Sequence, residues 1–311
     1  MKKLNYFKCF PDSQGNIYSL DMIRLNIDFG HDSPGVLING ETYGKRENLK
    51  EFMNYMRYLN EIDARFEIKY YPNFSQFKYR HLWNVSSPID DGVSLSIGLD
   101  LGGSNEARHK GFIEFNPNKC ENSTILHEFI GKVLALSVHT DLVRYDLAID
   151  IPIDRNLVRL VREGRKHYQY IDSGNGLTEY LGQRNTSGFV KLYDKTKESN
   201  LEEQTLTRLE MTIDSKTDIE KVFPVVRIND AQLKLPVDQD LTETDKVLVA
   251  LLRKEANQQF YLSQLGWRKR KKLEPYLADR VLTLDKQLAY KVKTLADYYE
   301  HYYTSDFDKL Q

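Results

Sequence analysis

Alternation of apolar and polar side chains predicts a first β-strand near the N-terminus. Residues 17–29, IYSLDMIRLNIDF, alternate over most of their length, which is typical of a strand with one buried face. Helical spacing follows in residues 48–62, where Phe52, Met56 and Leu59 fall on one side. The pattern therefore predicts a strand followed by an amphipathic helix that packs on the sheet.

Further strands are expected before the middle of the chain. Residues 93–99 and 111–115 are rich in side chains that favour strands, and a helix is expected from about residue 123 to 137. Another strand covers residues 142–153. Pro152 is expected to end it as a regular ladder member, because proline lacks the amide donor that a central strand needs.

The second half of the chain predicts one short helix and three more strands. Asp154 is expected to cap a helix that runs to Gly164. Residues 178–195 form two strand-like runs joined by the turn sequence QRNTSG, and residues 205–213 predict another strand. Several strands with interspersed helices and short connections indicate an α+β fold, with helices on one face of a largely antiparallel sheet.

The amino-acid composition changes near Val237, where helix-forming residues begin to dominate. We therefore predict two domains. Residues 1–236 would form the α+β domain, and residues 237–311 a helical domain for DNA binding or dimerisation.

A basic run in the helical region follows a predicted turn at Leu265 and Gly266. Successive cations at a helix start oppose the helix dipole, and an arriving phosphate backbone would relieve that conflict. A solvated basic helix is the alternative interpretation. The candidate DNA-binding residues here are Arg268, Lys269, Arg270, Lys271 and Lys272.

Composition adds limits but no direct sign of function. A chain of 311 residues with 41% hydrophobic side chains can bury a full core, and its formal net charge of -1 leaves DNA binding to local basic clusters. Cys9 and Cys120 make no disulfide framework, and no cationic apolar leader precedes them. The longest apolar stretches fall far short of the roughly 20 residues that cross a bilayer. We therefore expect a cytoplasmic protein without membrane contact.

Strand periodicity also collects chemically useful side chains, because alternate residues of a strand share one face. Arg144, Asp146 and Asp150 share a face of their strand, as do Lys191, Tyr193 and Lys195. If these strands form one sheet, a single face collects Glu114, Asp146, Asp150, Lys191, Tyr193, Arg208 and Glu210.

Such a face could bind a metal ion. Clustered carboxylates suit a hard cation such as Mg²⁺ or Mn²⁺, and a tyrosine beside the cation could act as a nucleophile. A solvated sheet face gives the same alternation, and tyrosine also has high β-propensity. Asp150 could equally be a turn residue at the end of its strand. The pattern alone leaves these interpretations open.

Three segments together resemble the motifs of the rolling-circle replication-initiation-factor family. They are LVRYDLAID at residues 142–150, TEYLGQRNTSGFVKLYDKTKES at residues 178–199 and LTRLEMTI at residues 206–213. In that family an Arg-x-Asp-Leu-Ala-x-Asp strand precedes a Tyr-x-Gly-x-Arg-x-Ser hairpin, a Tyr-Asp/Glu-Lys strand and an Arg-x-Glu strand. KGFIEFNPNKC also resembles a family element, with Pro117 and Lys119 at its glycine positions. The resemblance covers about residues 20–214.

The resemblance implies a metal-dependent nicking enzyme with a sheet related to that of the HUH endonucleases. A tyrosine of such an enzyme attacks one DNA strand, keeps the 5′-phosphate as an ester and frees a 3′-OH. The sequence has no His-hydrophobe-His motif, so carboxylates would have to hold the metal. By position, the resemblance implies metal ligands Asp146 and Glu210 with Asp150 or Glu114, the nucleophile Tyr193, and phosphate contacts from Arg184, Lys195 and Arg208. We expect Lys195 to be catalytic together with Tyr193, and we add Arg144 and Lys191 as expected DNA contacts.

One departure keeps a second interpretation open. Several relatives have another tyrosine four residues before the Tyr-Asp/Glu-Lys tyrosine, where this chain has Phe189. Tyr180 is a reserve candidate for the nucleophile. The chain could bind an origin without cutting it, or it could be a conjugative relaxase, which uses the same chemistry. Expected partners are origin DNA as a hairpin or single strand, a host helicase and polymerase, and a second copy in a homodimer.

Overall fold

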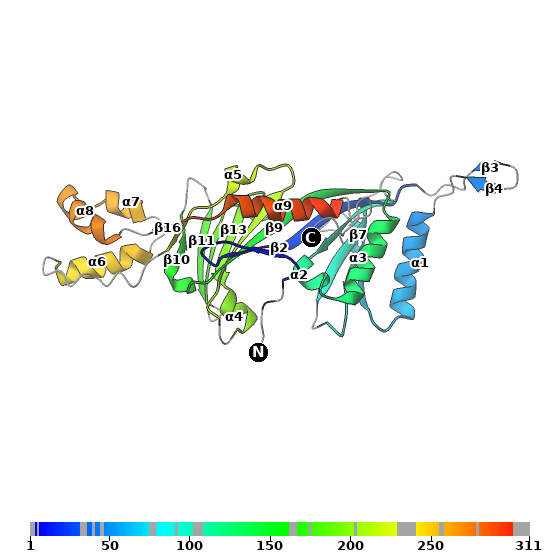
Figure 1. Cartoon of the computed structure of the whole chain (residues 1–311), viewed down its shortest axis with the longest axis horizontal. Helices are drawn as coiled ribbons and strands as arrows, with labels where there is room; N and C mark the ends of the chain where they lie inside the picture. Colours follow the sequence, from blue (N-terminus) through cyan, green and yellow to red (C-terminus); the bar gives the residue numbers. More distant parts are fainter. Residues whose placement is uncertain are drawn as a thin grey trace. The chain divides into compact units, whose positions relative to one another are not determined.

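The chain folds into two compact units that both combine helices with antiparallel strands (Figure 1). Unit 1 comprises Met1–Lys3, Pro11–Tyr18 and Ala148–Ala289, and unit 2 comprises Leu4–Phe10, Ser19–Leu147 and Tyr290–Gln311. The computed structural model describes residues 4, 6–31, 36–38, 41–43, 47–74, 79–90, 93–101, 108–161, 167–173, 176–201, 204–228, 241–254, 258–277 and 280–300. The predicted α+β class with a largely antiparallel sheet is confirmed.

Unit 2 is built on a sheet with the strand order β9-β2-β8-β7-β6-β5. The pairs from β2 to β5 are antiparallel, and the boundary between the units falls within β9. The strands are β1 (Cys9–Pro11), β2 (Ile17–Asp28), β5 (Glu67–Phe74), β6 (Tyr79–Ser86), β7 (Ser94–Leu101), β8 (Lys110–Phe115) and β9 (His139–Ile151), with a separate pair β3 (Val36–Ile38) and β4 (Glu41–Tyr43).

The helices of unit 2 pack on one face of this sheet. On α1 (Asn48–Glu61), Phe52 stacks on Phe29 at a centroid distance of 4.7 Å and meets Trp83 edge-on at 6.0 Å. On α9 (Lys286–Glu300), Tyr299 meets Phe115 at 5.4 Å. The strand registers place Trp83 and Phe115 on the same face, so the predicted one-sided helix layer is confirmed in this unit.

Two other helices complete the layer. In α3 (Thr124–Leu136), the Ser123 side chain caps the helix by accepting a hydrogen bond from the Leu126 amide at 3.2 Å. Phe129 of α3 stacks with Tyr55 of α1, so the two helices pack side by side (Figure 1). A short helix, α2 (Pro117–Cys120), precedes α3.

Unit 1 continues β9 with the antiparallel strands β14, β13, β12 and β11 and adds a small sheet in the order β10-β15-β16. Its strands are β10 (Val158–Leu160), β11 (Tyr168–Ser173), β12 (Gly176–Leu181), β13 (Phe189–Asp194), β14 (Thr207–Asp214), β15 (Val226–Ile228) and β16 (Arg280–Leu282). Its helices are η3 (Arg155–Leu157), α4 (Lys195–Ser199), α5 (Ile219–Val222), α6 (Glu243–Lys254), α7 (Gln258–Ser263), α8 (Trp267–Leu273) and η4 (Glu274–Leu277).

The helix predicted after Asp154 is wrong. Asp154 caps only the single turn η3, its carboxylate accepting from the Asn156 amide at 2.7 Å, and strand β10 follows. β10 pairs with β15, from which it is separated by about 65 residues, and Val158 and Leu160 are buried there. Pairing with a distant strand therefore overrode the local helical spacing.

The units also divide the chain differently from the predicted domains. The predicted boundary at Val237 lies outside the described residues. Strand β16 lies in the region that we predicted to be helical, where it pairs with β15. Residues 290–300 are grouped with unit 2, where Tyr299 packs on Phe115, and the predicted two-domain division stays a prediction.

Residues 241–254 and 258–277 nevertheless form a helical cluster with its own core of leucine and valine side chains, including Val249, Leu262 and Leu273. Thr242 and Asp245 cap α6 reciprocally, each amide donating to the other's side chain at 3.2 Å. No helix in the described part of the chain has the length and apolar character needed to cross a membrane.

Asp245 predicts a pH-dependent stability of this cluster. Hydrogen bonds from Lys269 and Lys272 hold the pKa of the buried Asp245 carboxyl well below its ordinary value. A lowered folded-state pKa stabilises the fold above the unfolded pKa of about 3.9, and this contribution is lost as the pH falls further. We expect Asp245→Asn to lower the unfolding midpoint at pH 7, with a difference from wild type that shrinks below about pH 4. Thermal melts of wild type and variant at pH 7 and pH 3 measure this difference.

The matched control is Glu243→Gln, which removes an exposed carboxylate whose partner Lys246 lies at 2.6 Å on the same helix. Exposed pairs of this kind contribute little, so its melt should follow wild type at both pH values. A difference for Asp245→Asn that is equally large at pH 3 and pH 7 would contradict the assignment.

Candidate functional site

Strands β13 and β14 bring Tyr193, Glu210 and Lys191 together on one face of unit 1. Their register pairs Lys191 with Glu210, so both side chains point to the same side. The Tyr193 hydroxyl donates to Glu210 Oε1 at 2.5 Å. Lys191 Nζ lies 3.6 Å from Glu210 Oε2 and 3.8 Å from the Tyr193 ring centroid. The three predicted residues form one hydrogen-bonded and charged cluster.

Tyr193 lies deep in this cluster, with 5% of its surface exposed. Lys195 is the first residue of α4, and its Nζ lies 5.8 Å from the Tyr193 ring centroid. Its ammonium group also donates to Glu198 at 2.6 Å. Lys195 therefore adds positive charge near the ring.

Asp150 and Arg208 form a buried ion pair at the base of this face. Arg208 donates through Nε and Nη2 to the two oxygens of Asp150, both at 2.6 Å. Asp150 is 0% exposed and Arg208 is 4% exposed. In this bidentate pair, the Asp150 carboxylate that we predicted as a metal ligand binds the Arg208 guanidinium that we predicted as a phosphate contact. The structure therefore favours a structural role for both residues.

The other predicted ligands belong to unit 2. Glu114 accepts hydrogen bonds from Arg144 at 3.0 Å and from Arg24 at 3.4 Å. Arg144, which we predicted to contact DNA, is therefore paired with a carboxylate. Asp146 lies on β9, partly buried. In unit 2 the predicted acidic side chain Glu114 is already balanced by cations.

Binding of Mg²⁺ or Mn²⁺ by the predicted carboxylates stays a prediction. Mg²⁺ is usually held by one or two carboxylates together with waters and substrate phosphates. Among the residues that the structure describes, no group of three or more Asp, Glu, His or Cys side chains is close enough to hold an ion. Asp150 faces Arg208, and Glu210 faces Tyr193 and Lys191. We therefore derive no chemical step through a metal.

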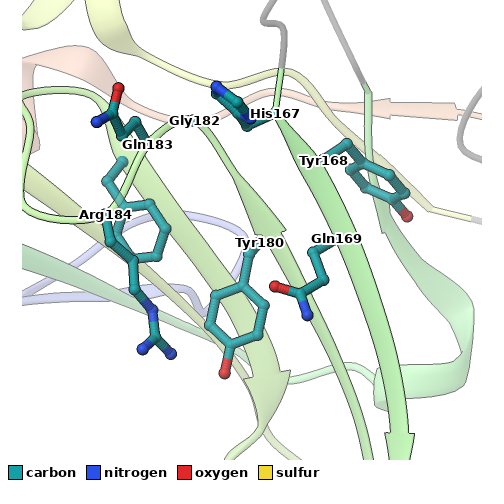
Figure 2. Close-up of a pocket in the computed structure, with 8 residues that line it drawn as sticks. His167, Tyr168, Gln169, Tyr180, Gly182, Gln183 and Arg184 are labelled. Atoms are coloured by element: carbon teal, nitrogen blue, oxygen red, sulfur yellow. The ribbon is translucent and has the colours of Figure 1, made fainter.

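Beside the tyrosine cluster lies an open hollow of about 430 Å³ that the sequence pattern did not indicate. Of its residues, only Arg184 was expected to bind DNA. Figure 2 shows the ring of Tyr180 between the side chains of Arg184 and Gln169. The hollow is lined by His167, Tyr168, Gln169, Tyr180, Gly182, Gln183, Arg184 and Phe189. The sequence held one signal for this hollow, the alternation of strand side chains. It places Phe189 and Lys191 on one face of β13, and Tyr180 of β12 pairs with Lys191.

The β12–β13 loop that forms one wall is tightly specified. Gly182 and Gly188 have φ angles of +93° and +82°, where a side chain would be strained. The Gly182 amide donates to the His167 carbonyl at 2.9 Å, and the Gly188 amide donates to the Thr212 carbonyl at 2.8 Å. The loop is therefore tied to β14 and to the chain just before β11.

A buried ionic network supports the hollow from the opposite face of β12. Glu179 accepts from Arg155 at 2.7 Å and from the Tyr168 hydroxyl and the Leu160 amide, both at 3.0 Å. Burial, followed by the nearby Glu179 charge, raises the pKa of Tyr168 well above its ordinary value. The phenol therefore stays protonated and keeps donating to Glu179. The sequence pattern gave no sign of a role for Glu179 or Arg155.

Helix α7 ends at Ser263 and the basic helix α8 begins at Trp267, so the turn predicted at Leu265 and Gly266 lies between two helices. Four of its five cations contact residues of the helical cluster. Lys269 and Lys272 face Asp245, Arg270 lies 3.6 Å from Glu274, and Lys271 lies over the Trp267 ring. Arg268 is exposed. These contacts favour the solvated helix, and DNA binding here stays a prediction.

Comparisons with known proteins add one structural likeness. No family model matches the chain, and no curated protein sequence matches it. A solved structure described as a rolling circle replication initiator protein from Geobacillus stearothermophilus is similar with a TM-score of 0.38 and 13% identity. The match covers 87% of this chain and all of that chain. Similarity at this level carries no argument about activity, so the function rests on the residues described above.

Proposed function

We propose that this protein is a rolling-circle replication initiator that binds a single DNA strand at an origin and cuts it with Tyr193. One observation carries the proposal. Three separate segments that resemble the family motifs contribute side chains to one face of unit 1. Asp150 comes from β9, Arg184 from the β12–β13 loop, Tyr193 from β13, and Glu210 from β14.

The geometry around Tyr193 suits a nucleophile with a neighbouring base. A free tyrosine has a pKa of about 10, so it needs a group that removes its proton. Glu210 already accepts that hydrogen bond at 2.5 Å and would take the proton. The phenolate oxygen would then form a bond to phosphorus, the bond from phosphorus to the 3′-oxygen would break, and the released 3′-oxygen would take up a proton.

The neighbouring cations would stabilise this reaction. Lys191 lies 3.8 Å from the ring centroid, where negative charge develops when the phenol ionises. Arg184 is exposed at the rim and would hold a strand phosphate. The products would be a 5′-phosphotyrosine and a free 3′-OH that a host polymerase could extend.

A second candidate function is an initiator that binds the origin without cutting it. Two observations favour it. Tyr193 is only 5% exposed, so DNA binding would have to open the face before attack. Phe189 also occupies the position at which relatives carry another tyrosine, and a phenyl ring cannot attack phosphorus. A relaxase would use the chemistry of the first proposal and differ only in its partners.

Incubation with a supercoiled plasmid carrying the native origin separates these candidates. Nicked circles with the protein joined to the 5′ end support the cutting initiator. Origin-specific binding without nicking supports the second candidate, and absence of both rejects the two proposals. Parallel reactions with Mg²⁺, with Mn²⁺ and with a chelator report whether cleavage needs the cation expected from the family resemblance.

A further inference from the structure

Apart from Arg184, the residues of the hollow take no part in the proposed cleavage chemistry, but the hollow opens on the same face of the sheet as Tyr193. The β12–β13 register pairs Tyr180 with Lys191 and Thr178 with Tyr193, so these side chains point to one side. On the other edge of β12, the register pairs Gln169 with Tyr180. A strand of DNA that reaches Tyr193 would therefore pass the hollow.

Two aromatic rings and one cation give the hollow the chemistry of a stacking site. The rings of Tyr180 and Phe189 lie nearly parallel, with an interplanar angle of 16° and a centroid distance of 6.0 Å. The Arg184 guanidinium lies 5.4 Å from the Tyr180 ring centroid. Both rings are partly exposed, so part of their area is available to another flat group.

Polar groups around the rings match the edge of a nucleobase. The Gln169 and Gln183 amides each offer donors and an acceptor, and both side chains are exposed in the hollow. Figure 2 shows Gln169 beside the Tyr180 ring and Arg184 on its other side. A volume of about 430 Å³ falls within the range of sites that hold small organic groups.

The hollow is also held in shape before any ligand arrives. Gly182 and Gly188 set the loop, and the buried pair of Glu179 and Arg155 fixes β12 from behind. A site that is already ordered loses less conformational entropy when it binds. This favours a specific contact over a chance surface feature.

We propose that this hollow binds one nucleotide of single-stranded DNA, with its base stacked against Tyr180 and its phosphate held by Arg184. The inference rests on the proposed function for the identity of the strand. Stacking suits this site because every base has a flat face, while a single cation accounts for one phosphate. An acidic peptide would use Arg184 but would gain nothing from the parallel rings.

Fluorescence anisotropy with single-stranded oligodeoxynucleotides of the origin's nick region tests the inference. We expect Tyr180→Leu to bind about 5- to 150-fold more weakly, because it removes one stacking surface. Tyr180→Phe keeps the ring and should bind like wild type. Arg184→Gln should bind more weakly and reduce the slope of log affinity against log salt by about 0.7, the value for one single-strand phosphate contact.

Tyr170→Leu is the matched control. Tyr170 is a tyrosine of the neighbouring strand β11, it is 50% exposed, and the register directs it to the opposite face. It should bind as tightly as wild type. Equal loss in Tyr170→Leu and Tyr180→Leu would overturn the inference, as would unchanged affinity in Tyr180→Leu.

A second measurement needs no variant. Oligonucleotides with one abasic position, moved stepwise along the strand, remove a base and keep its phosphate. Wild-type protein should show a loss of affinity at one position, and Tyr180→Leu should show no further loss there. Uniform affinity across all abasic positions would overturn the inference. Plasmid nicking is scored separately, so absent nicking with this binding signature rejects only cleavage, whereas nicking without the signature rejects only the nucleotide site.

Discussion

Tyr193→Phe is expected to lose strand nicking and the covalent DNA adduct, with a fall in cleavage rate of at least about 10³-fold. The change deletes only the hydroxyl that would attack phosphorus and that donates to Glu210. The ring stays, so its contact with Lys191 and its packing are kept. Supercoiled plasmid cleavage, followed by denaturing gel analysis of the adduct, measures the effect.

Tyr180→Phe is the matched control for this prediction. Tyr180 is the reserve nucleophile, it lies on the adjacent strand and the same face, and we expect its hydroxyl to be dispensable for cutting. Circular dichroism should report a folded protein for both variants. Cleavage that survives in Tyr193→Phe and disappears in Tyr180→Phe would transfer the nucleophile to Tyr180.

Asp150→Ala is expected to lower the free energy of unfolding by about 3–5 kcal/mol. Asp150 is 0% exposed and binds Arg208 through two hydrogen bonds of 2.6 Å. Removing the carboxylate leaves a buried guanidinium without its counterion. Urea unfolding followed by circular dichroism gives the difference.

A double variant separates this structural role from a metal-binding role. Asp150→Leu combined with Arg208→Met replaces the pair by apolar side chains and should recover most of the lost stability. Lys246→Ala breaks the exposed pair with Glu243 and should change the unfolding free energy by less than about 1 kcal/mol. A loss below about 1 kcal/mol in Asp150→Ala would contradict the structural assignment and return Asp150 to the set of possible ligands.

Much of the fold followed from local patterns. The strand at residues 17–29 and the helix at residues 48–62 match β2 and α1 closely, because both have a period that burial on one face demands. Pro152 ends β9 at Ile151 as expected. Alternation also predicts that Lys191, Tyr193 and Glu210 share one face, and the register of β13 and β14 gives this arrangement.

Other parts depended on long-range pairing. Residues 156–164 have helical spacing, but Val158 and Leu160 became a strand because β15 supplies a distant partner. Strands β5 and β6 and the small strand β16 were also not predicted. For such segments the local sequence allows more than one structure, and burial against the rest of the chain selects one.

The sequence by itself determined which side chains of each strand share a face, because alternation is a property of the backbone. It also determined the motif resemblance and the candidate tyrosine. Only the tertiary structure decided the partners: Asp150 binds Arg208 and Tyr193 binds Glu210. It also placed Tyr180 and Phe189 around a hollow. Strand order and register set these contacts, and they arise from burial and hydrogen bonding between segments far apart in the chain.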